Sequence, residues 1–178
     1  MHVLINIVAF KIGWVATIFG AANEFPLLGP AVIMIAILVH LVATKEPAQE
    51  LFLVFLAGVI GASFDSLFVA AGWLSYPNGT VVSGLAPYWI IALWMLFATT
   101  MNLAFSWLKS RMRLAALLGA IFGPVSYFFG AQAGAVVIND FSAAMIGLSI
   151  AWAISFPLLL ELTNQLDDAG SATTEVEA

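Results

Sequence analysis

The stretch GVIGASFDSLFVAAGW, residues 58–73, is apolar or small at almost every position and carries one ionisable residue near its middle. Steps of three and four residues place five positions on one stripe of a helix. These positions are Gly58, Gly61, Asp65, Phe68 and Gly72. Small residues on such a stripe let helix backbones approach closely in lipid. We therefore expect a membrane-spanning helix whose Asp65 faces a glycine-lined seam, away from lipid.

The composition of the whole chain also indicates that the protein lies in lipid. Of its 178 residues, 63% are hydrophobic and 8% are charged, and the mean hydropathy is +1.07. Soluble domains are about one quarter charged. A span needs about 20 apolar residues, and six such windows occur, near 2–22, 27–44, 51–73, 86–108, 114–136 and 141–161. The sequence therefore predicts an all-α polytopic integral membrane protein, one compact bundle of six transmembrane helices over residues 1–161.

The basic residues indicate the orientation. Lys45 lies in the second predicted loop, and Lys109, Arg111 and Arg113 lie in the fourth, whereas the other three loops contain neither Lys nor Arg. Basic residues in short loops stay in the cytoplasm. We therefore expect both termini to be cytoplasmic, including an acidic, disordered tail over residues 162–178.

Several classes of function are disfavoured by the sequence. It contains no cysteine, and the motifs HExxH, GxSxG, GxGxxG and the P-loop do not occur. Neither histidine has a second one at ligand spacing, so we expect no metal site and no cofactor, and we interpret His40 as an interfacial polar group. Much of the net charge of −5 lies in the tail, so nucleic acid is not an expected partner.

The predicted fifth span carries a second stripe of small residues. It contains two GxxxG spacings, Gly119 to Gly123 and Gly130 to Gly134. Such spacings are typical of close helix packing, either within one chain or with a second copy or another membrane protein. We therefore assign these four glycines, with Gly58, Gly61 and Gly72, to helix packing.

Polar groups inside the spans suggest a candidate intramembrane site. Lys11 interrupts the first span, and Thr99 and Asn102 share one stripe of the fourth. Charges inside a membrane are unfavourable unless they pair or share water, and Lys11 with Asp65 is the evident pair. Two readings remain open. One is structural, with Asp65 paired with Lys11 or satisfied by neighbouring Asn, Ser and Trp donors. The other is a polar pathway lined by Lys11, Asp65, Thr99 and Asn102.

Certain segments also resemble a known family. They are Gly13-Trp14, Asp65, Pro87-Tyr88-Trp89, LWMLFATTMN at 93–102, GPVSYFFG at 123–130, and Pro157. Together they resemble an uncharacterised bacterial inner-membrane family, domain of unknown function 2878. The resemblance implies a compact inner-membrane protein with an envelope or lipid context and supplies no catalytic residue. Family members carry His-Ser where this chain has Leu103-Ala104, so a role for that histidine does not transfer.

Three functions follow as hypotheses. The first is an interaction, scaffold or accessory protein in membrane-lipid or envelope processes, indicated by the glycine stripes. The second is a small carrier or lipid-handling protein that uses the Lys11 and Asp65 site. The third is a membrane-embedded lipid-modifying enzyme, for which the sequence offers no evident nucleophile. The partners expected are membrane lipids, with other membrane proteins or a second copy of the chain.

Overall fold

A computed structural model describes residues 3–176, with side chains described as far as Ala169. Residue 2 of the first predicted span and residues 177–178 of the predicted tail lie outside the described residues. The described elements in chain order are α1 (Val3–Ala22), α2 (Leu28–Ala43), α3 (Pro47–Ala70), β1 (Leu74–Ser75), α4 (Tyr88–Ala98), the 3₁₀ helix η1 (Ser106–Leu108), α5 (Met112–Gln132), β2 (Val137–Ile138) and α6 (Phe141–Val176). The predicted all-α class is confirmed.

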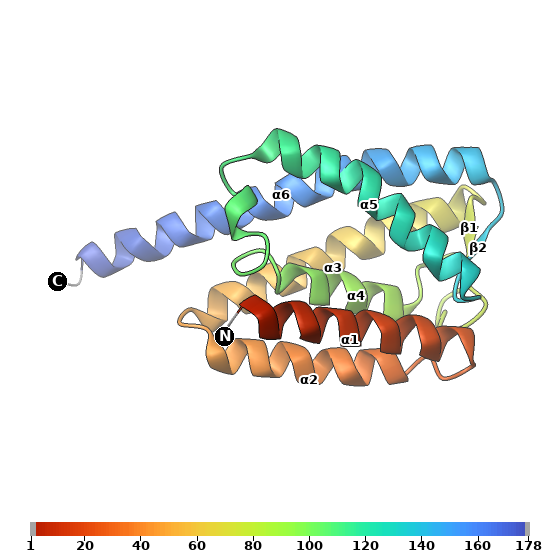
Figure 1. Ribbon diagram of the computed structural model, residues 1–178, viewed down its shortest axis with the longest axis horizontal. Helices are drawn as coiled ribbons and strands as arrows, with labels where there is room; N and C mark the ends of the chain where they lie inside the picture. Colours follow the sequence, from red (N-terminus) through yellow and green to blue (C-terminus); the bar gives the residue numbers. More distant parts are fainter. Residues whose placement is uncertain (1–2, 177–178) are drawn as a thin grey trace.

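The helices pack as three antiparallel hairpins, α1 with α2, α3 with α4, and α5 with α6 (Figure 1). Both chain termini and the α2–α3 and α4–α5 connections lie at one end of the bundle, which we call the terminal end. The other three connections, with β1 and β2, lie at the distal end (Figure 1). Helix α4 packs against α1, α2 and α3, so it is the central element.

Four helical segments are long and apolar enough to cross a membrane: α1, α3, α5 and Phe141–Ala169 of α6. The helix α2 has 16 residues and α4 has 11, or about 24 Å and 16 Å at 1.5 Å per residue, against a hydrocarbon core of about 30 Å. Length and composition alone therefore support four spans and leave α2 and α4 as shorter apolar helices.

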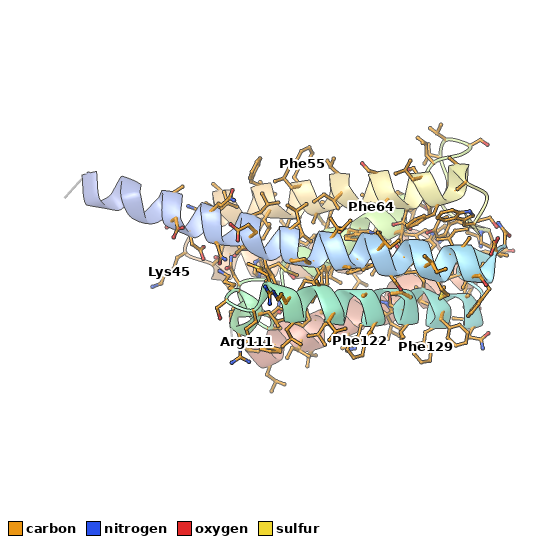
Figure 2. The ribbon with its side chains drawn as sticks, turned by 90° about the horizontal axis from the view of Figure 1, so that it is seen from above. Lys45, Phe55, Phe64, Arg111, Phe122 and Phe129 are labelled. Atoms are coloured by element: carbon orange, nitrogen blue, oxygen red, sulfur yellow. The ribbon has the colours of Figure 1, made fainter. Side chains whose placement is uncertain are left out.

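The surface of the bundle has the polarity of a protein in lipid. Large apolar side chains point outward along its sides, including Phe55, Phe122 and Phe129 (Figure 2), which are 61%, 62% and 57% exposed. Polar side chains such as Asp65 are completely buried. Soluble monomers rarely expose apolar patches of this extent, and such patches mark protein or membrane contacts.

The predicted fourth span, 86–108, is wrong in its second half, because α4 ends at Ala98 and turns follow. The hydroxyl groups of Thr99 and Thr100 donate to the carbonyls of Leu96 and Phe97, at 2.7 and 2.5 Å. The Asn6 amide donates to the Thr99 carbonyl at 3.1 Å. The carbonyls of Leu96 and Phe97 also accept from the backbone N–H groups of Thr99 and Thr100, at 3.2 and 3.0 Å. Three-residue turns therefore replace the α-helical hydrogen bonds here, and the side chains add further donors to the same carbonyls.

The helix α6 differs from the expectation at its other end. It does not stop near Glu161 but continues to Val176, so helix covers most of the segment that was expected to be a disordered tail. Two residues of this extension contact the α4–α5 connection: Asn164 donates to the Lys109 carbonyl at 3.3 Å, and Asp167 pairs with the Lys109 ammonium at 2.6 Å.

Two of the seven glycines assigned to packing end helices instead. Gly72 and Gly134 have φ of +74° and +88°, and a Cβ added at either would meet nothing closer than 4.0 Å. Each occupies the left-handed position of a Schellman motif, in which a glycine is favoured. The chain then enters β1 after α3 and β2 after α5, and these strands pair antiparallel, Leu74 with Ile138. This pairing ties the distal ends of α3 and α5 together.

The other five glycines lie at contacts within the chain. A Cβ on Gly61 would overlap the Trp94 ring, and one on Gly123 would overlap the Trp152 ring. A Cβ on Gly58 would meet Met95, and one on Gly119 would meet the carbonyl of Trp152. A Cβ on Gly130 would lie in contact with Ile18 and Val136. The two indoles, seated in these notches, stack with their centroids 4.3 Å apart. The seams are therefore filled by this chain's own side chains.

Candidate functional site

Asp65 is the centre of a buried hydrogen-bond cluster. The Tyr76 hydroxyl donates to Oδ1 at 2.5 Å, and the Trp94 Nε1–H donates to Oδ2 at 2.9 Å. The Tyr127 hydroxyl lies 2.8 Å from both carboxyl oxygens. An ionised carboxylate accepts hydrogen bonds only, so it matches three donors. No ion pair to Asp65 occurs among the described residues.

Each donor comes from a different part of the fold. Trp94 lies on α4, Tyr127 on α5 and Tyr76 on the α3–α4 connection, while Asp65 lies about one and a half turns before α3 ends. Burial, and then the charge of Asp65, raises the pKa of the Tyr76 phenol well above its usual value, so this group keeps its proton and donates. The cluster therefore joins three helices and a connection at one charged point.

The four residues of the predicted polar site do not meet. Lys11 is exposed on α1, and no ion pair or hydrogen bond joins it to Asp65 within residues 3–169. At 1.5 Å per residue Lys11 lies about 17 Å from the distal end of α1, whereas Asp65 lies about 8 Å from that of α3. Thr99 and Asn102 belong to contacts near the terminal end.

A cavity of about 630 Å³ lies between α1 and α5, with α4 and part of α6 behind it. All three donors to Asp65 line it, so the carboxylate lies directly behind its wall. The rest of the lining is largely aromatic and aliphatic, with Lys11 and Ser126 as the further polar side chains. Its rim includes Phe122 and Phe129, which belong to the outward apolar surface. We call it the aromatic cavity.

One hydrogen-bond donor in the aromatic cavity lacks a well-formed hydrogen bond. The Trp152 Nε1–H is buried and forms no hydrogen bond of normal geometry to any described residue, although the Tyr127 hydroxyl lies close enough to interact with it. Its ring is fixed by the stack on Trp94 and by an edge contact with Phe97, at centroid distances of 4.3 and 5.1 Å. Buried donors are nearly always paired in native proteins, and an unpaired one is unfavourable by about 1–3 kcal/mol.

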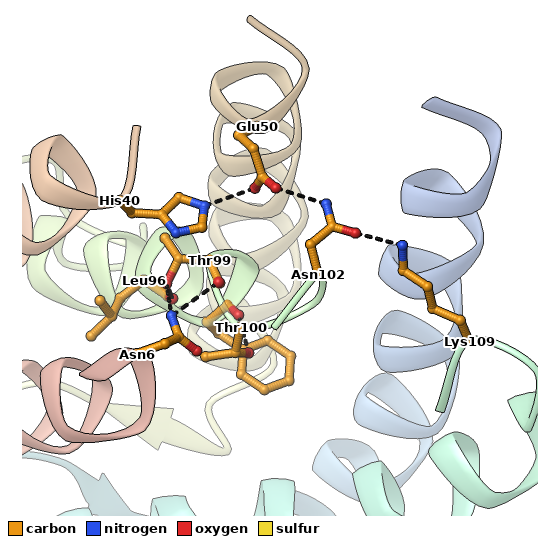
Figure 3. A network of polar contacts seen from close by, with 9 residues as sticks. Asn6, His40, Glu50, Leu96, Thr99, Thr100, Asn102 and Lys109 are labelled. Atoms are coloured by element: carbon orange, nitrogen blue, oxygen red, sulfur yellow. Dashed lines mark hydrogen bonds and ion pairs between the residues drawn. The ribbon is translucent and has the colours of Figure 1, made fainter. Parts of the chain in front are cut away.

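A second polar cluster lies near the terminal end (Figure 3). His40 Nε2 lies 2.9 Å from Glu50 Oε2, and Asn102 donates to the other Glu50 oxygen at 2.7 Å. The Lys109 ammonium donates to Asn102 Oδ1 at 2.5 Å and pairs with Asp167. The cluster connects α2, α3 and α6 through the segment that follows α4, and it borders a pocket of about 340 Å³.

This second cluster has mainly a structural character. His40 and Glu50 are only 2% and 5% exposed, so water does not reach them freely. Their contact gives His40 Nε2 and Glu50 Oε2 the partner that burial would otherwise deny them. Within the described part of the chain, no group of three or more His, Asp or Glu side chains is arranged to hold a metal ion. His40, expected as an interfacial polar group, is thus buried and paired with Glu50 across the α2–α3 connection.

The sequence predicted a buried Asp65 with a tryptophan as one possible donor, but it did not identify Trp94 and did not predict the two tyrosines. Tyr76 and Tyr127 lie 11 and 62 positions away, beyond the reach of a helical stripe. A signal was present, because both tyrosines stand out in SYPNG and GPVSY, but polar groups were sought only near Asp65, Lys11, Thr99 and Asn102. The pairing of His40 with Glu50 had a weaker signal, two polar residues flanking one short turn.

No curated protein and no solved structure matched the chain. A family model with the description "Protein of unknown function (DUF2878)" matches residues 3–158. The match includes Asp65 with its three donors and the whole lining of the aromatic cavity. The chain, from the start of α1 to the apolar part of α6, belongs to the DUF2878 family, whose function is unknown.

Proposed function

We propose that this protein is a multi-pass protein of the bacterial inner membrane that takes a lipophilic molecule from the bilayer into the aromatic cavity. The observation that carries the proposal is the cavity itself, about 630 Å³ in size and bordered by side chains of the outward apolar surface. Ligand sites for small molecules have volumes of about 300–1,000 Å³ and are mostly apolar with few polar groups. A cavity that opens among lipid-facing side chains is accessible from the membrane.

The proposed topology has six spans, with α2 and α4 crossing beside the four long helices and both termini in the cytoplasm. The arrangement of the basic residues supports it. Lys45 and Arg111 lie at the terminal end (Figure 2), and Lys109 and Arg113 belong to the same connection and the adjoining start of α5. Short basic connections on one side of the membrane are typical of the cytoplasmic side.

Lipid handling is favoured over the interaction role by the packing of the glycine seams. The seams were the reason to expect a protein partner, but Gly61 and Gly123 are occupied by Trp94 and Trp152 of the same chain. Because these notches are filled internally, they offer no docking groove. A scaffold or accessory role and an enzymatic role therefore stay predictions without an observation specific to them.

The proposal is tested by filling the cavity from one wall. Leu118 lines the aromatic cavity, whereas its neighbour Leu117 does not and is 55% exposed. Leu118→Trp directs an indole into the cavity, and Leu117→Trp adds the same group to the outward surface. The full chain is purified in a mild detergent, and co-purifying apolar molecules are extracted and measured by mass spectrometry.

We expect the wild type and Leu117→Trp to retain a bound apolar molecule in a fixed ratio to protein, and Leu118→Trp to lose it. Thermal unfolding serves as the control for folding, and Leu118→Trp should unfold at a midpoint close to that of Leu117→Trp. Equal retention by both folded variants, or no retained molecule in any of the three proteins, would contradict the proposed function.

A further inference from the structure

We propose that the ligand of the aromatic cavity is an amphiphile with an anionic head group, held by the Lys11 ammonium and the Trp152 Nε1–H. This inference rests on the proposed function and adds the chemical class of the ligand. It is carried by the polarity of the cavity lining, in which Lys11 and Trp152 have no ion pair or well-formed hydrogen bond to the described residues, and both are hydrogen-bond donors.

Lys11 is the first of these donors. It lines the cavity from α1 and is exposed, with the apolar neighbours Val8, Ile12 and Val15 on the same helix exposed as well. None of the described residues forms an ion pair with it. A cation within an apolar span is unfavourable, and such residues in membrane proteins commonly mark a ligand or ion pathway. An anionic head group at the cavity rim would supply the missing partner.

Trp152 is the second donor, and it lies deeper in the cavity. Its Nε1–H is buried and forms no hydrogen bond of normal geometry, and the stack on Trp94 opposes a turn of the ring that would improve its approach to the nearby Tyr127 hydroxyl. A ligand oxygen in front of this ring would accept the hydrogen bond. The two donors therefore require the same complement, an acceptor-rich and negatively charged ligand.

A cationic ligand fits this lining less well, although aromatic walls attract cations. The negative charge nearest to the cavity is Asp65, and its oxygens are already engaged by Tyr76, Trp94 and Tyr127. No acidic side chain is among the residues that line the cavity, and Lys11 would repel a cation at the rim. The electrostatics thus favour an anion.

The carboxylate of a fatty acid and the phosphate of a phospholipid share the required chemistry. The experiment distinguishes them with brominated probes, because bromine quenches tryptophan fluorescence on contact and Trp14, Trp89, Trp94 and Trp152 line the cavity. The full chain in neutral detergent is titrated with dibromostearic acid, with its methyl ester, and with dibrominated phosphatidylglycerol and phosphatidylcholine, at a pH that ionises the acid.

We expect saturable quenching by at least one anionic probe, at a concentration about tenfold or more below that for its neutral or zwitterionic counterpart. Tenfold is the change that one charge-assisted hydrogen bond produces. Lys11→Met should abolish this preference and leave binding of the counterpart unchanged. Lys45→Met is the matched control, because Lys45 lies outside the aromatic cavity, and it should behave as the wild type.

Trp152→Phe separates the second donor from the stacking role of the ring. It should weaken binding of acid and ester alike, because both carry a carbonyl-type oxygen, while the preference for the acid remains. If acid and ester saturate at equal concentrations in the wild type and Leu118→Trp blocks both, the cavity binds lipid but the anionic class is wrong. If no probe saturates, both this inference and the proposed function fail.

Discussion

Replacing Asp65 and Lys11 singly and together distinguishes the hydrogen-bond cluster from the ion pair that the sequence suggested. In the structure Asp65 accepts from Tyr76, Trp94 and Tyr127. An asparagine offers one acceptor oxygen and one NH₂ donor. One amide orientation sets the NH₂ group against the Trp94 Nε1–H, and the other leaves the Tyr76 hydroxyl proton without its acceptor. One lost hydrogen bond to a charged group lowers stability by about 1.5–3 kcal/mol, which is the expected effect of Asp65→Asn.

Lys11→Met should behave differently. The side chain is exposed among apolar residues and is unpaired within the described residues. A lysine at the centre of a span is unfavourable by roughly 2.5–3.5 kcal/mol on insertion scales, so its removal should leave the free energy of unfolding unchanged or raise it. Because the two sites share no contact, the double variant should equal the sum of the single variants within about 0.5 kcal/mol.

The assay is denaturant unfolding of the purified chain in mixed micelles, followed by circular dichroism, for the wild type, Asp65→Asn, Lys11→Met and the double variant. Near-additive changes support the cluster as described. A double variant that regains most of the stability lost by Asp65→Asn would mean that the two charges interact, and the arrangement around Asp65 would then be refuted.

Other substitutions probe the packing and the second cluster. Gly61→Ala places a methyl group against the rigid Trp94 ring and should destabilise by about 1–3 kcal/mol. Gly58→Ala, whose nearest neighbour is the flexible side chain of Met95, should change stability by less than about 1 kcal/mol. Equal effects of the two substitutions in thermal unfolding would argue against the notch. Glu50→Ala leaves the buried His40 Nε2 without its acceptor and should destabilise the protein by about 1–3 kcal/mol in the same assay. An unchanged midpoint of thermal unfolding would contradict a structural role for the second cluster.

Much of the fold was predictable because helices in lipid need long apolar runs. Four of the predicted apolar windows coincide closely with the helices α1, α2, α3 and α5. The early end of α4 was not predictable from hydropathy, since it depends on local hydrogen bonds from Thr99 and Thr100 and on Asn6 of another helix. Apolar composition specifies where a chain can cross lipid, and it does not specify where a backbone leaves the helix.

The candidate site was predictable only in part for a related reason. The stripe of small residues correctly placed Asp65 in a buried seam, because helical periodicity is local. Its partners come from distant segments, and only the packed structure brings them together. Lys11 was assigned to the same site because opposite charges in lipid should pair. The structure places Lys11 on the cavity side of the wall that hides Asp65, and no described residue forms an ion pair with it.

Trp94 takes part in three arrangements at once: it fills the notch at Gly61, donates to Asp65 and stacks on Trp152. This sharing constrains how the family can diversify. A larger residue at position 61 requires a smaller one at position 94, and that change would leave the aspartate without a donor and the second indole without its stack. We therefore expect positions 61, 65, 94 and 152 to covary when homologous sequences are aligned.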